Sequence, residues 1–177
     1  MKRILSVLTL VLVIASFGWA GNTATPLQVL FVLKKVFPEA KEINVLVTSS
    51  QLATQQKRIG RAAAQTKLKA KIFEINSPTD IGKAIKEIPS GGYLVVFADD
   101  ELAKNSNKIY ILSKCKEKHI ALITSSRDYS DSGALLGVLL DANHKTNIVL
   151  NLKHNAFLAS KFSDEFIQKA GIAEVLQ

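Results

Sequence analysis

Cysteine is almost absent from this sequence, since Cys115 is the only one in 177 residues. A single cysteine cannot close an intrachain disulfide, which excludes the small disulfide-stabilised scaffolds. Cys115 follows Ile111 by four residues and Leu112 by three, within a segment that we expect to be helical. This spacing predicts that Cys115 packs as a small buried hydrophobe rather than serving in redox chemistry.

The common catalytic and metal-binding signatures are also absent. The sequence contains no GxSxG nucleophile elbow, no GxxxxGK[ST] phosphate loop and no HExxH zinc pair. No two of the histidines, His119, His144 and His154, stand three to five residues apart. The adjacent carboxylates of Asp99 and Asp100 are by themselves weak evidence for a metal. We therefore expect a non-enzymatic protein without metal or cofactor, and we rank an enzyme third among the functions considered.

Aromatic residues make up only 7% of the chain, and few of them lie among the lysines. Proteins that bind single-stranded nucleic acid combine a basic groove with aromatic stacking platforms, so we expect no nucleic-acid partner. The lysines are instead scattered over the predicted helices, although the formal net charge is +8. This pattern is typical of a solvated basic surface, and attraction to anionic ligands or lipid head groups is the alternative.

Only one long apolar run occurs, and it lies at the N-terminus. Lys2 and Arg3 precede this uncharged run, and small residues stand at the −3 and −1 positions before Gly21. The layout predicts a secretory signal peptide over residues 1–20, because the run is too short to span a bilayer comfortably. No cysteine lies at the predicted cut, which argues against a lipid anchor. We expect residues 21–177 to form one exported domain, periplasmic or secreted, with an uncleaved membrane anchor as the alternative.

Sequence patterns typical of helices and of strands alternate over residues 26–124. Four segments have a helical spacing or a helix-start signature, and four are short and apolar. The clearest helix start has Ser77 and Asp80 placed to form a capping box. Strands apolar on both faces and joined by helices are typical of a parallel sheet covered on both sides. The predicted helices are residues 26–37, 49–66, 77–88 and 102–118, and the predicted strands are residues 42–48, 71–75, 93–98 and 120–124.

The order of elements changes in the last third of the chain. Residues 125–133 are polar and predict a loop. No helix fits between the apolar segments 134–140 and 147–152, which therefore predict an antiparallel hairpin. A helical tail follows, with Ser163 as its N-cap and Gly171 at its end. The whole pattern predicts a single α/β domain, Rossmann-like and three-layered, with a mostly parallel sheet and a C-terminal antiparallel hairpin.

Polar residues follow several of the predicted parallel strands. Ligands of such sheets bind at the carboxyl ends of the strands. Hydroxyl groups and helix-start amides can bind a carboxylate or phosphate there, and aspartates can hold an amino group. We therefore predict a site for a small polar or zwitterionic ligand, with the alternative that these residues only cap helices and form turns. The predicted site residues are Ser49, Ser50, Asp99, Asp100, Ser125 and Ser126.

The central segment resembles one lobe of the ABC-type solute-binding proteins. The stretch PEAKEINVL matches the family's P-x-A-K-x-I-x-V-L strand entry. The stretch INSPTDI is similar to its V-x-S-x-x-D-I helix entry. Asp99 or Asp100 takes the place of the family's aspartate after the third strand. The resemblance implies a lobe that contributes to the binding of a solute.

The last part of the chain departs from that pattern and resembles the tail of YfiR-like periplasmic proteins. In that family a glycine precedes one strand, and Gly133 takes this place. Another strand ends in a motif with an asparagine and an alanine, and Asn151 and Ala156 take their places. This resemblance implies a periplasmic inhibitor of a membrane-bound diguanylate cyclase. Members usually carry disulfide cysteines, which this chain lacks, so a redox-sensing role does not carry over.

Two hypotheses of function follow. The first is an exported, non-enzymatic regulatory protein that binds an inner-membrane protein such as a diguanylate cyclase. It ranks first because one lobe cannot close around a solute as two lobes can. The alternative is a single-lobe solute-binding component of an ABC-type transporter, with a small polar ligand. A homodimer is compatible with either hypothesis.

Overall fold

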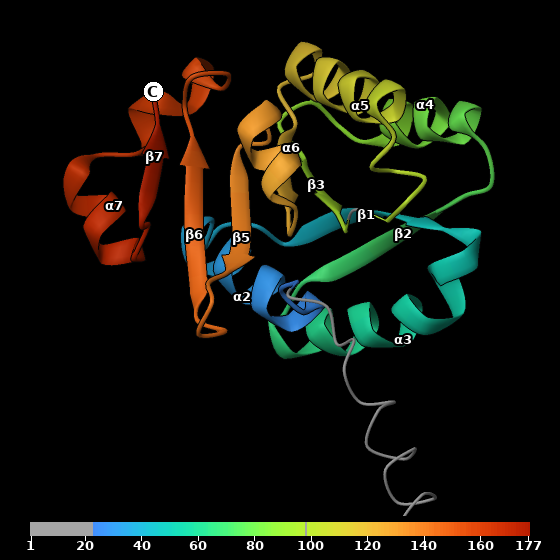
Figure 1. The fold of residues 1–177 in the computed structure, drawn as a ribbon, viewed down its shortest axis with the longest axis horizontal. Helices are drawn as coiled ribbons and strands as arrows, with labels where there is room; N and C mark the ends of the chain where they lie inside the picture. Colours follow the sequence, from blue (N-terminus) through green and yellow to red (C-terminus); the bar gives the residue numbers. More distant parts are fainter. Residues whose placement is uncertain (1–22, 98) are drawn as a thin grey trace, which may run out of the picture.

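The computed structural model describes residues 23–97 and 99–177, so the predicted signal peptide lies outside the described residues. Helices and strands alternate through the first four strands as the sequence predicts (Figure 1). The elements are α2 (Pro26–Val36), β1 (Glu42–Thr48), α3 (Ser49–Gln65), β2 (Lys69–Ile75), α4 (Pro78–Glu87), β3 (Tyr93–Val96), α5 (Asn105–Glu117), β4 (Ala121–Thr124), α6 (Arg127–Ser132), β5 (Leu136–Leu140), β6 (Thr146–Asn151), the 3₁₀ helix η1 (Ala156–Lys161), α7 (Asp164–Ala170) and β7 (Glu174–Leu176).

The strands form one seven-stranded sheet in the order β2-β1-β3-β4-β5-β6-β7. The neighbours from β2 to β5 pair in parallel. β5 and β6 form the predicted antiparallel hairpin, in which Val138 pairs with Ile148. β7 adds to β6 in parallel through the pair Leu150 and Val175. The predicted α/β class with a C-terminal hairpin is confirmed, whereas the terminal strand β7 was not expected after the helical tail.

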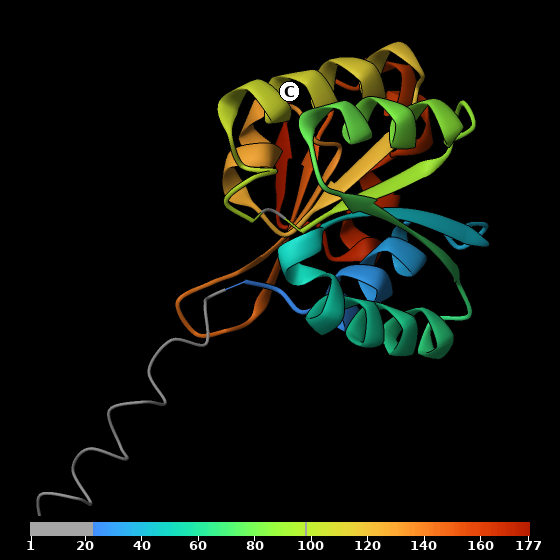
Figure 2. The ribbon, with the colours of Figure 1, turned by 90° about the vertical axis from the view of Figure 1, so that its right-hand side faces the viewer.

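Helices cover both faces of the sheet, which gives the predicted three layers. α2 and α3 lie on one face, and α4, α5 and α6 lie on the other (Figure 2). Alternate residues of β1 serve the two faces, because successive strand side chains point in opposite directions. Val45 packs with Leu30 and Ile59 on the first face, and Leu46 packs with Ile81 and Ile111 on the second. The two hydrophobic cores explain why the central strands β3 and β4 are apolar at almost every position.

The helix over residues 26–37 forms, but the helical spacing of Leu27, Leu30 and Phe31 does not mark its buried face. Leu30 is fully buried, whereas Leu27 and Phe31 are 42% and 65% exposed. The helix is apolar on most of its circumference, so its orientation depends on the contact with α3 and the sheet rather than on its own pattern. In α5, Leu112 is likewise only half-buried, although its place three residues before the buried Cys115 predicts a position in the core.

Some helices begin where the sequence predicts, and others do not. The capping box of Ser77 and Asp80 is present at the start of α4. Thr48, rather than Ser49 or Ser50, occupies the N-cap position of α3. The predicted loop 125–133 contains the short helix α6, whose six residues are too few to produce a periodic pattern.

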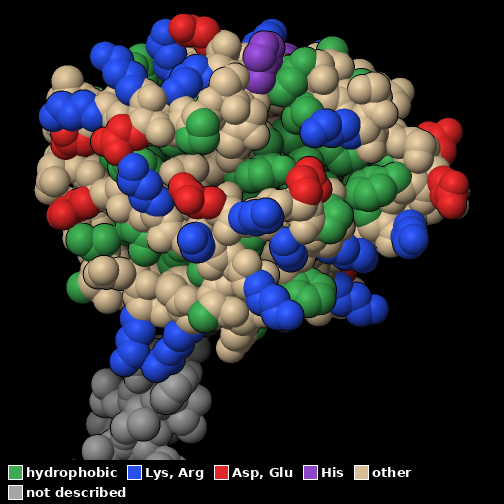
Figure 3. Space-filling view, turned by 180° about the vertical axis from the view of Figure 1, so that it is seen from behind, with side chains coloured by type: hydrophobic (Ala, Val, Ile, Leu, Met, Phe, Trp, Pro, Cys, Tyr) green, Lys and Arg blue, Asp and Glu red, His purple; other side chains and the backbone are tan. Residues whose placement is uncertain are grey.

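Lysine and arginine side chains are spread over the surface. Figure 3 shows them across the rear face, with acidic and hydrophobic side chains between them. Such mixing is typical of a solvated basic surface. Within the described ranges, no helix has the length and apolar character that crossing a membrane requires.

Candidate functional site

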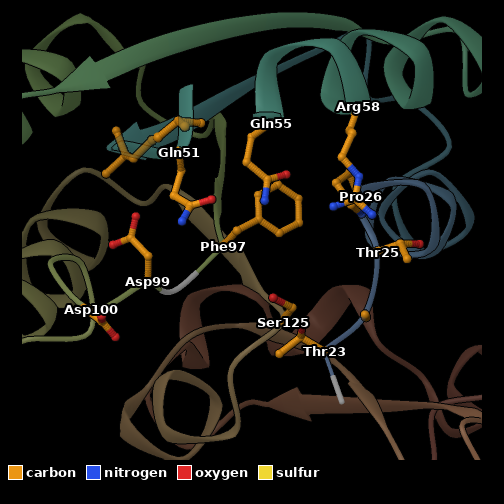
Figure 4. A pocket seen from close by; sticks show the side chains of 13 residues that line it. Thr23, Thr25, Pro26, Gln51, Gln55, Arg58, Phe97, Asp99, Asp100 and Ser125 are labelled. Carbon is orange, nitrogen blue, oxygen red and sulfur yellow. The ribbon is translucent and has the colours of Figure 1, made fainter. Parts of the chain in front are cut away.

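The sheet changes its direction of growth at β1. The chain passes from β1 through α3 to β2, and then through α4 to β3 on the other side of β1. The segments that leave β1 and β3 therefore turn to opposite faces of the sheet, and ligands bind in the crevice that such a reversal creates. A cleft of about 630 Å³ opens at this position (Figure 4). Its walls come from β1, α3, the loops after β3 and β4, and the residues around the start of α2.

Asp99 lines the cleft and is held by hydrogen bonds from two directions. The Thr48 hydroxyl donates to its Oδ2 atom. The backbone N–H groups of Leu102 and Glu101 donate to its Oδ1 atom at 2.9 and 3.2 Å. The Asp99 carboxylate therefore joins the end of β1 to the loop after β3, and much of its accepting capacity is already used.

Tyr129 of α6 forms a hydrogen bond to the loop after β3, which carries Asp99. Its hydroxyl donates to the backbone carbonyl of Leu102 at 2.6 Å, and the side chain is fully buried. Burial raises the pKa of Tyr129 far above its ordinary value, so the phenol stays protonated and keeps donating. This contact fixes the loop that carries Asp99.

Ser125 follows β4 and lines the cleft beside Asp99 and Asp100. Its position is fixed because the Thr124 hydroxyl donates to the carbonyl of Val96 at 3.0 Å, which ties the end of β4 to β3. The next residue, Ser126, accepts a hydrogen bond from the backbone N–H of Tyr129 and caps α6.

The cleft adjoins a second hollow of about 650 Å³. Ser125 lines both cavities, and Ser126 lines only the hollow. Asp99 and Asp100 border both cavities. Asn147 of β6 borders the hollow, and its buried Oδ1 atom has no hydrogen-bond partner among the described residues. The polar surface offered to a ligand thus extends from α3 to the β5–β6 hairpin.

Ser49 and Ser50 make contacts at the start of α3 instead of lining either cavity. The Ser49 hydroxyl donates to the Asn76 side chain and to the carbonyl of Ile75. The Ser50 hydroxyl shares a hydrogen bond of 3.1 Å with Thr48. Of the six predicted site residues, the structure brings Asp99, Asp100 and Ser125 into the cleft and places Ser126 in the adjoining hollow.

Three polar residues of α3 complete the cleft, and our sequence reasoning missed them. Gln51, Gln55 and Arg58 recur at i, i+4 and i+7, so they share one face of the helix. Figure 4 shows their side chains extending from α3 into the cleft. The Oε1 atom of Gln55 is buried and accepts no hydrogen bond within the described chain. A buried acceptor left unpaired is costly, so a donor from a ligand or from water would stabilise it.

Charges of opposite sign lie on different walls of the cleft. Arg58 extends from α3, whereas Asp99 and Asp100 lie in the loop after β3 (Figure 4). Phe97, the first residue after β3, lines the cleft beside them. Neither Arg58 nor Asp100 forms a salt bridge with another described residue. The cleft can therefore offer a guanidinium to an anionic group and a carboxylate to a cationic group of one small molecule.

The arrangement of acidic residues does not form a metal centre in the described part of the chain. No group of three or more histidine, cysteine, aspartate or glutamate side chains lies there in a position to hold an ion.

Comparison with known protein families identifies a family whose sequence profile covers the cleft-forming part of the chain. The sequence profile described as "ABC transporter substrate binding protein" matches residues 23–146. This range includes every described residue that lines the cleft, from Thr23 to Ser125. A search of curated proteins finds no match.

Solved structures with a similar fold include proteins from three bacteria. A conserved domain protein from Vibrio cholerae has a TM-score of 0.71 and 12% identity, with 86% of this chain and 61% of that chain covered. An ABC domain from Streptococcus pneumonia, in complex with L-Trp, has a TM-score of 0.69 and 17% identity, with 86% and 60% covered. A ligand-free, open substrate-binding protein with adhesive properties from Clostridium difficile has a TM-score of 0.58 and 17% identity, with 81% and 54% covered. The matched part of this chain thus spans 54–61% of the length of these proteins, and identities this low show the fold alone.

Proposed function

The chain belongs to the ABC transporter substrate-binding family, and on this premise we propose that it binds a small zwitterionic solute in the cleft between α3 and the loops after β3 and β4. Proteins of this family bind substrates and are typically periplasmic or extracellular. The proposal therefore agrees with export of residues 21–177 after removal of the predicted signal peptide.

The observation that carries the proposal is the pair of unmatched charges in the cleft. Arg58 can form a bidentate interaction with a carboxylate of the solute. Asp100 can accept hydrogen bonds from an ammonium group, and it is freer to do so than Asp99, whose oxygens already accept three hydrogen bonds. Gln55 can accept a further hydrogen bond, and Phe97 supplies apolar surface beside these polar groups.

These features suit an α-amino acid better than a sugar or a phosphate ester. An α-amino acid carries the carboxylate and the ammonium group that the cleft can pair, and Phe97 can contact its side chain. The complex of the Streptococcus pneumonia protein with L-Trp supports this choice, because L-Trp belongs to the same chemical class. We therefore propose amino acids as the substrate class.

The second half of the proposal concerns the partner. A substrate-binding protein passes its solute to a membrane transporter, so an ABC-type permease is the proposed inner-membrane partner. The regulatory hypothesis, in which the partner is a diguanylate cyclase, stays a prediction that the family match does not support. Recovery of proteins from native membranes with the purified chain as bait separates the two partners.

A thermal-shift panel tests the binding proposal. At least one amino acid at millimolar concentration should raise the melting temperature, and Arg58→Gln or Asp100→Asn should abolish that increase. Arg61→Gln is the matched control, because Arg61 lies on the exposed side of the same helix and does not line the cleft. The proposal is wrong if no amino acid raises the melting temperature, or if the control variant loses the response as fully as Arg58→Gln does.

A further inference from the structure

A third cavity lies apart from the cleft, between α5 and the segment that joins β6 to η1. Its volume is about 580 Å³, within the range of about 300–1,000 Å³ that small-molecule sites occupy. It shares no described lining residue with the cleft or with the adjoining hollow. We call it the α5 groove.

The floor of the α5 groove is apolar. Cys115, Ile120 and Leu122 form it and are buried, and Leu112 beside them is half-buried. Ile109 lies at the edge of the groove and is 56% exposed. Ile109 therefore extends the apolar lining of the groove to its exposed edge, and contiguous apolar surface of this kind marks ligand grooves and contact sites.

The rim of the α5 groove is cationic. Lys116 is exposed there, and none of the described residues that line the groove carries a carboxylate. Lys108 also lines it, although its Nζ atom donates to both carboxylate oxygens of Asp128 at 2.8 and 2.7 Å. The charge at this rim therefore favours an occupant with a negative group.

A tilted contact between the His119 and Phe157 rings holds the far side of the α5 groove in place. The two ring centroids are 4.7 Å apart, and the contact joins the end of α5 to η1. His154, which precedes η1, lines the groove from this side. The groove is thus formed by segments that side-chain contacts already fix to each other.

We propose that the α5 groove binds an amphipathic carboxylate, with its hydrocarbon or aromatic part over the floor at Leu112 and its carboxylate at Lys116. A second copy of the chain is the competing occupant. An isologous dimer through this face would place one cationic rim against another, which like-charge repulsion disfavours. The proposal is independent of the amino-acid site, because the two cavities share no described lining residue.

Titration of the full chain with decanoate, followed by calorimetry, tests this proposal. We expect saturable binding with one decanoate per chain and much weaker binding of decyltrimethylammonium, which has the opposite charge. Lys116→Glu should weaken decanoate binding by roughly tenfold or more, as expected for loss of a charge-assisted contact. Ile109→Gln should also weaken it, and because Ile109 is exposed this variant should fold normally.

Two control variants separate the α5 groove from other sites. Lys86→Glu makes the same charge change at an exposed position of α4 and should leave decanoate binding unchanged. Arg58→Gln alters only the amino-acid site and should also leave it unchanged. Equal binding of both detergent-like ions, or no loss with Lys116→Glu, would overturn the proposal. A concentration-dependent dimer that Ile109→Gln abolishes would overturn it as well, because the groove would then be a contact between copies.

Discussion

The hydroxyl of Thr48 donates a hydrogen bond to the carboxylate of Asp99, across the point where the sheet reverses its direction of growth. The contact links the last residue of β1 to the loop after β3, and the backbone N–H groups of Glu101 and Leu102 complete the shell around Asp99. Asp100, the next residue, is exposed and borders both cavities. We therefore propose different roles for the two adjacent aspartates: Asp99 shapes the cleft, and Asp100 offers its carboxylate to the proposed solute.

This division predicts different effects of two similar substitutions. Asp99→Asn should lower the free energy of unfolding by about 1–3 kcal/mol, because the Thr48 hydroxyl and two amides lose part of their acceptor. Asp100→Asn should change it by less than about 0.5 kcal/mol, as is usual for an exposed position. Urea denaturation of the two variants measures both values. Equal stabilities of the two variants would contradict the assigned roles.

Tyr129→Phe tests the hydrogen bond that joins α6 to the loop after β3. Removal of the hydroxyl leaves the Leu102 carbonyl without its donor in a buried position, so the free energy of unfolding should fall by about 1–2 kcal/mol. Amino-acid binding should weaken in the same variant, although Tyr129 does not line the cleft. Unfolding and ligand titration of one preparation give both values, and a variant with wild-type affinity would show that the loop keeps its position without this contact.

The two-core architecture predicts a large cost for Ile85→Ala. Ile85 is buried between α4 and the sheet, so truncation should cost about 2–5 kcal/mol of unfolding free energy. Ile109→Ala is the matched control, because Ile109 is a well-exposed isoleucine on the same side of the sheet. Similar losses in the two variants would mean that α4 does not pack as described.

Cys115 predicts a specific pH dependence. Burial raises the pKa of its thiol from 9.0 to about 12, because the thiolate would lose its hydration. The unfolded chain thus releases this proton at a lower pH than the folded chain does. The contribution of Cys115 to stability is fully present below pH 9 and is lost as the pH rises towards 12.

Measurements on a Cys115→Ala variant check this sign. Thermal unfolding between pH 8 and 11 should show a smaller decline in the variant than in the wild type. The wild-type thiol should also resist a thiol reagent at pH 8 until the chain unfolds. Rapid labelling of the folded chain would contradict the buried position of Cys115.

Most of the fold could be predicted because its signals are local. β1 is rich in β-branched and apolar residues, and Ser77 and Asp80 form the capping box that their spacing indicates. β7 could not be predicted in this way, because its three residues are defined only by pairing with β6. The orientation of α2 depends in the same way on what packs against it, so exposed Phe31 could not be told from buried Leu30.

Of the residues that line the cleft, only those that follow strands could be predicted from the sequence. Asp99, Asp100 and Ser125 follow strands, and strand ends meet at one edge of a parallel sheet. Gln51 and Arg58 lie on the polar face of a helix, which is normally solvated. Their spacing shows that they share a face, but only the docking of α3 beside the reversal at β1 turns that face towards the cleft.

A titration followed by amide NMR measures the central claim most directly, namely that the cleft binds a small zwitterionic solute. The labelled protein is titrated with a mixture of the common amino acids, so the identity of the substrate need not be known. We predict that the amide signals of Gln55, Phe97, Asp100 and Ser125 move together and saturate, and that they do not move in Arg58→Gln. Saturating shifts confined to other parts of the chain, or none at millimolar concentrations, would contradict the account.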